Sequence, residues 1–296
     1  MIEALLAALA GLLIGSFLNV CIYRLPLDLS IVSPRSYCPE CDHGIAWYDN
    51  VPILSYIILR GRCRHCQIRI PFRYPLVEFL TAACFFLAVW LRPHGIDVLA
   101  VKYCVFSAIV IALIFTDVEE RILPDEFTLG GVVIGLVFAW FIKPDSTQIS
   151  ILRFFLPSIE NQQLLSLIEA AFAAAFSSLS LWLVGFVYGK LRQREVLGLG
   201  DVKMVAMIGA FLGLQQVLLT LIVGSLLGSL VGLLYIYFTR RRILPRVTRR
   251  YGTFAGIYLF FLTSKYQLPF GAFLGIGAIA VAFWGEIVIA WYRKLG

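Results

Sequence analysis

Long apolar stretches, each ending in polar or charged residues, are the feature that most limits what this chain can fold into. A helix needs roughly 20 apolar residues to cross the hydrocarbon core of a membrane. Stretches of about that length lie at 4–23, 75–92, 98–116, 127–142, 164–189, 217–238 and 270–291. A shorter stretch at 202–214 is interrupted at its start by Asp201 and Lys203. We therefore expect an all-α polytopic membrane protein with about eight transmembrane helices. The run 253–263 is too short to span and is interpreted as an interfacial or re-entrant segment.

The composition supports this class and excludes several others. Apolar residues make up 60% of the chain and charged residues 15%, with a mean hydropathy of +0.87. In globular chains, roughly 45–50% of residues are apolar and about 25% are charged. A water-soluble core of this size cannot bury the excess, which excludes a secreted disulfide scaffold, a disordered chain and a soluble nucleotide enzyme. The net charge of +7 is therefore interpreted as a signal of membrane topology, and we expect no nucleic-acid partner.

Basic residues concentrate in alternate loops, which predicts the orientation of the chain. They are frequent after the first helix, between the fifth and sixth helices and after the seventh helix: Arg24, Arg35, Arg60, Arg62, Arg64, Arg69, Arg73, Lys190, Arg192, Arg194, Arg240, Arg241, Arg242, Arg246, Arg249, Arg250 and Lys265. The positive-inside rule places these loops in the cytoplasm and the N-terminus outside. Binding of membrane lipid through anionic headgroups is an alternative use of the same charges.

The loop at 24–74 is a substantial polar segment with two C-x-x-C pairs, Cys38 with Cys41 and Cys63 with Cys66. Two such pairs can place four thiolates tetrahedrally around zinc. Thiols stay reduced in the cytoplasm, so zinc is favoured over the alternatives of two labile disulfides or four free thiols. Four protein ligands leave no coordination position for water, so the predicted zinc is structural rather than catalytic.

Two aspartates stand at the ends of apolar helices, where acidic residues are costly and are candidates for function. Asp117 ends the third helix on its cytoplasmic side, and Asp201 follows Gly198-Leu-Gly200 before the run 202–214. The glycines leave room for a backbone or a peptide against Asp201. Two carboxylates held close share a proton, so one acts as base and the other as acid. On spacing alone, Asp201 also suits an ordinary N-cap.

Helix dipoles provide a way to distinguish the two aspartates. The C-terminal end of the third helix favours a protonated Asp117. The N-terminal end of the short helix predicted at 202–214 favours an ionised Asp201. Asp125 is interpreted as the N-cap of the fourth helix, and Glu78 as an acid in a structural pair or at the membrane interface.

Taken in order along the chain, these residues and their neighbours resemble one family, the type IV prepilin peptidases. These are GxGD aspartyl proteases, the bifunctional leader peptidase/N-methyltransferases of bacterial pilus and type II secretion systems. The matching segments cover nearly the whole chain: Gly15-Ser-Phe-Leu-Asn-Val-Cys-Ile-Tyr-Arg-Leu-Pro26, the paired cysteines with Asn50-Val-Pro52, Ser55 and Arg60-Gly61, then Arg73-Tyr-Pro-Leu-Val-Glu78, Asp117, Leu123-Pro-Asp125, Gly198-Leu-Gly-Asp-Val-Lys203 and Pro269-Phe-Gly271.

The resemblance implies a multi-pass enzyme of the bacterial inner membrane that cuts type IV prepilins or type II secretion pseudopilins at the cytoplasmic face. Its catalytic residues would be Asp117 and Asp201, with Gly198, Gly200 and Lys203 completing the motif. The family then methylates the new N-terminal amine with S-adenosylmethionine as methyl donor.

The methyl transfer is attributed by the resemblance to the cysteine-loop side, where Gly61 and Glu78 match the family. The chain is accordingly divided into transmembrane helix 1 (1–23), the cytoplasmic zinc loop (24–74) and a membrane peptidase domain with about seven helices (75–296).

One departure from the family lies near the C-terminal end, where Ala272 stands in place of the last proline of P-F-G-P. Three alternatives remain beside the bifunctional enzyme. They are a peptidase without methyltransferase activity, a proton-coupled transporter whose membrane acids form a relay, and a non-enzymatic zinc-bearing assembly scaffold.

Overall fold

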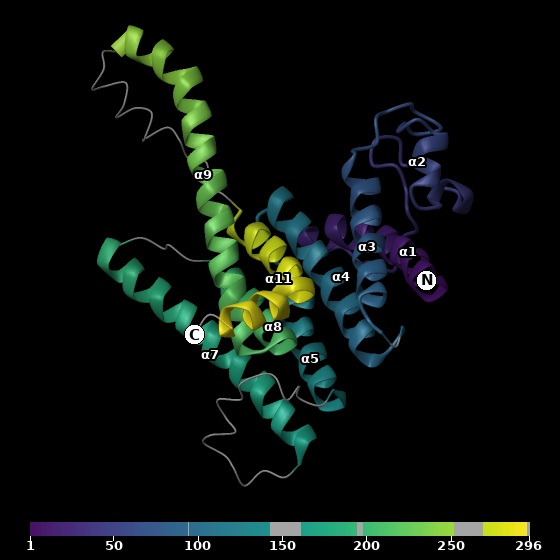
Figure 1. Cartoon of the computed structure of the whole chain (residues 1–296). Helices are drawn as coiled ribbons and strands as arrows, with labels where there is room; N and C mark the ends of the chain where they lie inside the picture. The colour runs from purple at the N-terminus through teal and green to yellow at the C-terminus, as the bar shows by residue number, and fades with distance from the viewer. Residues whose placement is uncertain (94, 143–160, 194–197, 252–268, 295–296) are drawn as a thin grey trace.

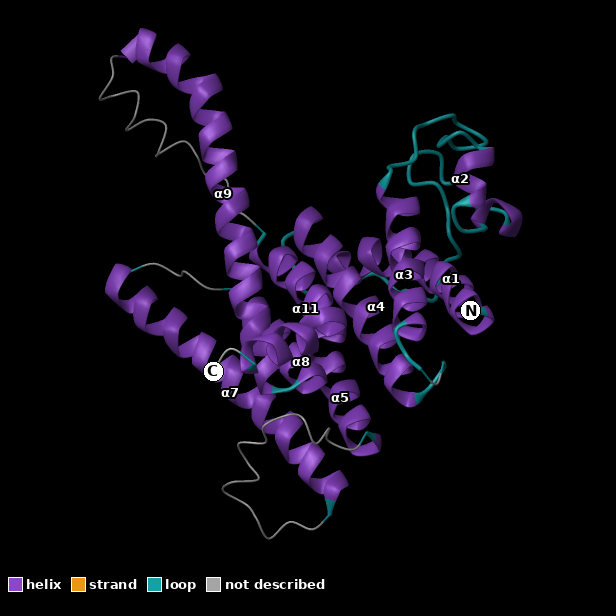
Figure 2. Cartoon of the chain, in the orientation of Figure 1, coloured by secondary structure: helices purple, strands orange, loops and turns teal. Residues whose placement is uncertain are grey.

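The computed structural model describes residues 1–93, 95–142, 161–193, 198–251 and 269–294 (Figure 1). The described residues are helical or irregular, and none of them forms a β-strand (Figure 2). The helices are α1 (Ile2–Arg24), α2 (Leu54–Ile58), α3 (Arg73–Trp90), α4 (Val98–Glu119), α5 (Asp125–Phe141), α7 (Gln162–Arg192), α8 (Leu199–Leu212), α9 (Leu214–Tyr251) and α11 (Phe270–Arg293), with the 3-10 turns η1 (Leu25–Leu27) and η2 (Trp47–Asn50).

The prediction of an all-α multi-pass membrane protein is confirmed. Six of the described helices are long and apolar enough to cross a membrane, namely α1, α3, α4, α7, α9 over Leu214–Tyr235, and α11. The helices α5 and α8 have 17 and 14 residues, fewer than a crossing normally takes. The predicted count of eight spans therefore stays a prediction. The run 253–263 lies outside the described residues.

The helix α4 lies between two halves of the core. One face of α4 packs with α1 and α3 around Ile111, while the other packs with α8 and α11 around Phe106 and Leu113. Residues with no exposed side-chain surface occur on both faces because α4 is apolar all round. The short helix α8 is also enclosed, since it packs against both α5 and α7.

The cysteine loop and the C-terminal end of α4 lie on the same side of the bundle. The guanidinium of Arg73, the first residue of α3, forms an ion pair with Glu119, the last residue of α4. The loop enters α3 at this residue, and Figure 1 shows it as an irregular lobe above the α3 end.

Small residues bring α1 and α3 into backbone contact. A Cβ atom added to Gly11 would lie 2.7 Å from the Cα of Ala82, and one added to Gly15 would lie 2.7 Å from the Cα of Glu78. No larger residue fits at either position without moving the helices apart. Glycines four residues apart let two helix backbones approach closely in lipid, and Gly11 and Gly15 do so at this contact.

We expect Gly11→Ala to lower the free energy of unfolding by about 1–3 kcal/mol, because the added methyl meets backbone rather than a flexible side chain. Gly130→Ala is the matched control, since Gly130 also lies in an apolar helix and has nothing within 4 Å of an added Cβ. Reversible unfolding of the detergent-solubilised protein measures both. Equal stability of the two variants would contradict the close α1–α3 packing.

Candidate functional site

Three helix ends meet at the two predicted aspartates. Asp117 lies in the last turn of α4, Asp201 in the first turn of α8 and Gly271 in the first turn of α11. A Cβ atom added to Gly271 would lie 3.0 Å from Asp117 Oδ2 and 3.3 Å from Asp201 Oδ1. These two carboxylate oxygens therefore cannot be farther apart than the sum of those distances. Both can contact one water molecule or one peptide carbonyl between them.

Asp117 is held by the N-terminus of α11. Its Oδ2 atom accepts a hydrogen bond of 2.7 Å from the backbone N–H of Ala272, and the residue is 7% exposed. A free N–H in the first turn of a helix stabilises negative charge. The sequence-based argument for a protonated Asp117 considered only the dipole of α4. The structure adds the Ala272 N–H, which favours the ionised carboxylate instead.

The departure from the family motif bears directly on this hydrogen bond. Pro269 precedes the first residue of α11, so Ala272 is in the helix turn where N–H groups have no partner within the helix. Proline has no N–H. Ala272 therefore supplies a donor to Asp117 that a proline, expected at this position from the resemblance, would lack.

The alternative assignment of Asp201 as an ordinary N-cap is wrong in the structure. The N-cap residue of α8 is Gly198, and no side chain caps this helix end. Instead, the Asp201 carboxyl group lies near Gly198, whose added Cβ would be 3.6 Å from Asp201 Oδ2. A Cβ at that distance would make an ordinary van der Waals contact, and the predicted room for a peptide at Gly198 stays a prediction.

Gly200 and Lys203 connect α8 to the segment that precedes α5. A Cβ added to Gly200 would lie 3.2 Å from Leu123, so this glycine allows close packing on the Leu123 side chain. Lys203 Nζ donates to both carboxylate oxygens of Asp125 at 2.7 and 2.9 Å. Asp125 is the first residue of α5 after the N-cap Pro124, which corrects its interpretation as an N-cap.

The four cysteines of the loop converge on one point. The Sγ atoms of Cys38, Cys41, Cys63 and Cys66 all lie within 4.8 Å of one another. Cys38 Sγ and Cys66 Sγ are 3.8 Å apart, which is about the sulfur–sulfur edge of a tetrahedron with Zn–S bonds near 2.3 Å. All four thiols are free in the structure. The donor set and its dimensions fit a zinc ion.

Each C-x-x-C pair is folded by the same backbone pattern. The residue after each pair, Asp42 or Gln67, has a positive φ and donates its N–H to the carbonyl of the first cysteine. In the second pair, the N–H groups of Cys66 and His65 donate to the Cys63 sulfur and lower the pKa of that thiol to about 7. Donors turned toward sulfur stabilise the thiolate form, which is the form that ligates metal.

Side chains around the cysteines fix the lobe. The rings of His43 and His65 lie 3.5 Å apart at their centroids, and neither is needed as a ligand. Arg64 donates to Asp49 at 2.5 and 2.7 Å, which holds the pKa of that carboxyl below its usual range. This exposed pair ties the second cysteine pair to η2.

Glu78 holds a strained turn of the cysteine loop. Its Oε2 atom accepts from the N–H of Ile53 at 2.7 Å, and its side chain also bonds Ser16. Ile53 has φ 58° and ψ −48°, in a three-residue turn closed by a hydrogen bond from Leu54 to Pro52. A β-branched residue is rarely found at positive φ. The buried carboxylate therefore supports a conformation that the backbone disfavours.

Gly61 lies at the other end of α2 from Ile53. It has φ +66°, donates to the Tyr56 carbonyl and begins the turn into the second cysteine pair. A Cβ there would also lie 2.9 Å from the Tyr56 hydroxyl. Gly61 and Glu78 thus act on opposite ends of α2 and have no direct hydrogen bond.

Sequence reasoning missed three contributions to the site. Ala272 was noted only as a departure from a motif, and nothing in its side chain indicates that its N–H would bond Asp117. Ile53 gave no signal, because a β-branched residue is not expected at positive φ. Gly271 was quoted only as part of Pro269-Phe-Gly271, with no role given.

Two family models together cover most of the chain. Residues 9–92 match the bacterial peptidase A24 N-terminal domain, and residues 104–233 match the type IV leader peptidase family. The first range contains α1, the cysteine loop and α3, and the second contains Asp117 and Asp201.

Individual relatives give the same result. The chain is similar to the prepilin leader peptidase/N-methyltransferase of Myxococcus xanthus, with 40% identity over 78% of this chain and 62% of that protein. It is similar to the enzyme of the same name from Pseudomonas putida, with 32% identity over 96% of this chain and 92% of the relative. The chain is also similar to the type 4 prepilin-like proteins leader peptide-processing enzyme of Escherichia coli O78:H11. The identity is 34% over 94% of this chain and 93% of that protein. No solved structure matches the chain. The chain belongs to the type IV leader peptidase family.

Proposed function

We propose that this protein is a membrane aspartyl endopeptidase that removes the leader of type IV prepilins or pseudopilins and then N-methylates the new N-terminal residue. The observation that carries the proposal is the approach of Asp117 and Asp201 to one point beside Gly271. The names of its relatives, prepilin leader peptidase/N-methyltransferase, support both activities.

Cleavage requires a water molecule activated against a peptide carbonyl. Between two close carboxylates, one accepts the proton of the attacking water while the other donates a proton to the carbonyl oxygen. The Ala272 N–H holds the Asp117 carboxylate in place, and the bare backbone at Gly198 leaves Asp201 open to an extended substrate. The proton belongs to the pair rather than to one residue.

The methyl transfer belongs on the cysteine-loop side of the protein in this proposal. S-adenosylmethionine supplies the methyl group when bound. Glu78 is the buried acid on that side that would pair with the ammonium group of the cleaved substrate. The zinc ion held by the four cysteines would fix the loop, with no position left for substrate.

The proposed orientation places the N-terminus outside the inner membrane and both sites on the cytoplasmic side. The Arg73–Glu119 ion pair supports one shared side, because it joins the start of α3 to the α4 end that carries Asp117. Basic residues in the loop support the cytoplasmic assignment of that side.

We expect Asp117→Asn and Asp201→Asn each to slow leader removal at least about a hundredfold, because an amide neither accepts nor supplies the catalytic proton. Mass spectrometry of a type IV prepilin incubated with the protein in vesicles measures leader loss and methyl gain separately. Glu120→Gln is the control, since Glu120 is an exposed acid three residues from Asp117. Methylation of a peptide without leader should continue in all three variants.

Other outcomes of this experiment select among the alternatives. Leader loss without methyl gain in the wild-type protein would leave a peptidase alone. Undiminished cleavage by Asp201→Asn would remove the two-carboxylate mechanism. If a panel of prepilins remained uncut by the wild-type protein, a scaffold or transporter would be the better interpretation.

Gly271→Ala tests the geometry of the pair rather than its chemistry. The added methyl would be 3.0 Å from Asp117 Oδ2, so the carboxylates must move apart. We expect kcat for cleavage to fall about tenfold with KM nearly unchanged, since a small misplacement of reacting groups has a large effect on rate. Ala272→Gly, which retains the N–H donor, is the control. A loss confined to KM would contradict this role of Gly271.

Zinc content tests the cysteine site directly. Elemental analysis of the purified protein should give one zinc per chain, and Cys63→Ser or Cys66→Ser should lose most of it, because serine is a poor zinc ligand. Cys104→Ala, a cysteine of α4 away from the cluster, should keep full zinc. If the wild-type protein contains no zinc and its mass shows two disulfides, the four cysteines form disulfides rather than a zinc site.

A further inference from the structure

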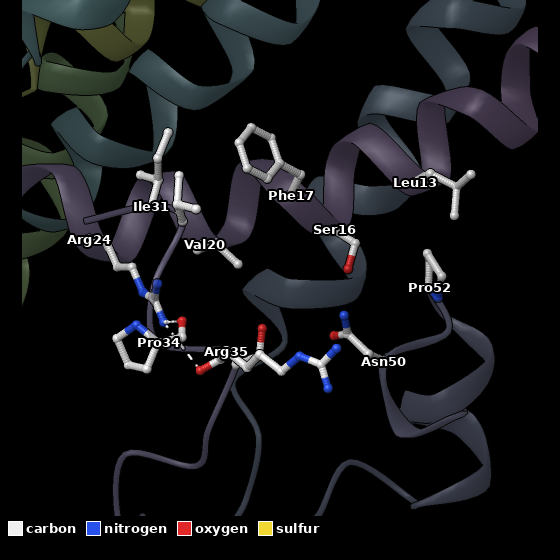
Figure 3. Close-up of a pocket in the computed structure, with 12 residues that line it drawn as sticks. Leu13, Ser16, Phe17, Val20, Arg24, Ile31, Pro34, Arg35, Asn50 and Pro52 are labelled. Carbon is white, nitrogen blue, oxygen red and sulfur yellow. Dashed lines mark hydrogen bonds between the residues drawn. The ribbon is translucent and has the colours of Figure 1, made fainter. Parts of the chain in front are cut away.

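A cavity of about 330 Å³ opens between α1 and the cysteine loop, away from the aspartate pair. Figure 3 shows α1 side chains on one side and loop side chains on the other. Its lining combines apolar and polar groups: Leu13, Ser16, Phe17, Val20, Arg24, Ile31, Val32, Pro34, Arg35, Ser36, Asn50 and Pro52. The volume lies within the range of ligand sites.

The lining changes from apolar to basic along α1. Leu13, Phe17 and Val20 follow one another at helical spacing on the same face, and the first two are 66% and 50% exposed. Arg24 ends the helix on the loop side. The helix α1 is long and apolar enough to cross a membrane, so its exposed apolar face beside the cavity would contact acyl chains, and Arg24 would lie toward the headgroups.

The two arginines at the basic end have different roles. Arg24 is buried and donates to the carbonyls of Ser30, Pro34 and Arg35, so its guanidinium holds the loop against α1. The guanidinium of Arg35 is exposed and makes no hydrogen bond or ion pair with the described residues. Figure 3 shows it extending across the cavity mouth toward Asn50.

We propose that this cavity binds one anionic phospholipid, with its phosphate at Arg35 and Asn50 and an acyl chain along Leu13, Phe17 and Val20. Arginine matches phosphate through paired N–H donors. Basic residues next to the end of a membrane-spanning helix attract anionic headgroups. S-adenosylmethionine fits this charge less well, because its sulfonium and ammonium groups outweigh its single carboxylate and the lining supplies two arginines.

The bound lipid would join the loop to the membrane beside Glu78. Asn50 and Pro52 line the cavity, and the next residue, Ile53, donates its N–H to Glu78. Ser16 lines the cavity from α1 and also bonds Glu78. Occupation of the cavity would therefore fix both partners of that carboxylate.

Native mass spectrometry of the full chain, released from vesicles that contain phosphatidylglycerol and phosphatidylcholine, tests the proposal. We expect one phosphatidylglycerol to be retained in preference to phosphatidylcholine. Arg35→Gln should reduce its retention about fivefold or more, because one charge-assisted contact is lost. Arg69→Gln is the matched control, since Arg69 is an exposed arginine of the same loop outside the cavity. A phosphatidylglycerol with a photoreactive acyl chain should label α1 within residues 13–20.

Four outcomes would overturn the lipid site. Equal retention by Arg35→Gln and Arg69→Gln would remove the role of Arg35, and equal retention of the two lipids would remove the selectivity for an anion. Displacement of the lipid by inorganic phosphate would indicate a site for a soluble anion, and one-for-one displacement by S-adenosylmethionine would indicate a site for the methyl donor. None of these results depends on whether the protein cleaves or methylates a prepilin.

Discussion

The placement of two carboxylates where three helices end is the constraint on which the rest of this structure depends. A buried carboxylate is costly unless donors or charge compensate it. Here the compensation for Asp117 comes from the first turn of α11, which must arrive at the end of α4 for the Ala272 N–H to reach Oδ2. The bare backbone of Gly271 allows that approach, because any side chain would meet both carboxylates. The packing of α11 on α4 and α9 is therefore also the assembly of the site.

The cysteine lobe shows a different way of holding a functional segment. Its described residues contain few buried apolar side chains, and its shape comes from directional contacts instead. The cysteine pairs converge on a metal-sized space, Arg24 binds loop carbonyls, and Glu78 holds the turn at Ile53. Each of these contacts is polar and fixes orientation. A lobe held this way needs no apolar core of its own, provided that the cysteine cluster and the carboxylate keep their positions.

The sequence predicted the participants of the site better than their contacts. Four cysteines at zinc spacing and two acids at the ends of apolar helices were identifiable from residue type and position, because these residues are chemically unusual where they stand. The all-α membrane class followed from the length of the apolar stretches. The contact of Ala272 with Asp117 could not be predicted, since 155 residues separate them and the contact uses a backbone N–H common to nearly all residue types. The count of spans depends on α5 and α8, whose lengths fall near the limit for crossing.

The sequence shows only local helix ends, and this explains why the helix-dipole argument for Asp117 was incomplete. A helix end visible in the sequence gives the sign of its own dipole, but the field at a carboxylate is the sum over all helix ends that reach it. The α4 terminus opposes negative charge at Asp117, and the α11 terminus supports it through a direct hydrogen bond. A direct bond acts at a shorter distance than the dipole of the whole helix, so the α11 contact is the stronger local influence. The family motif has proline where this chain has Ala272, and a proline supplies no such donor. The backbone at Ala272 thus contributes directly to the site in this chain.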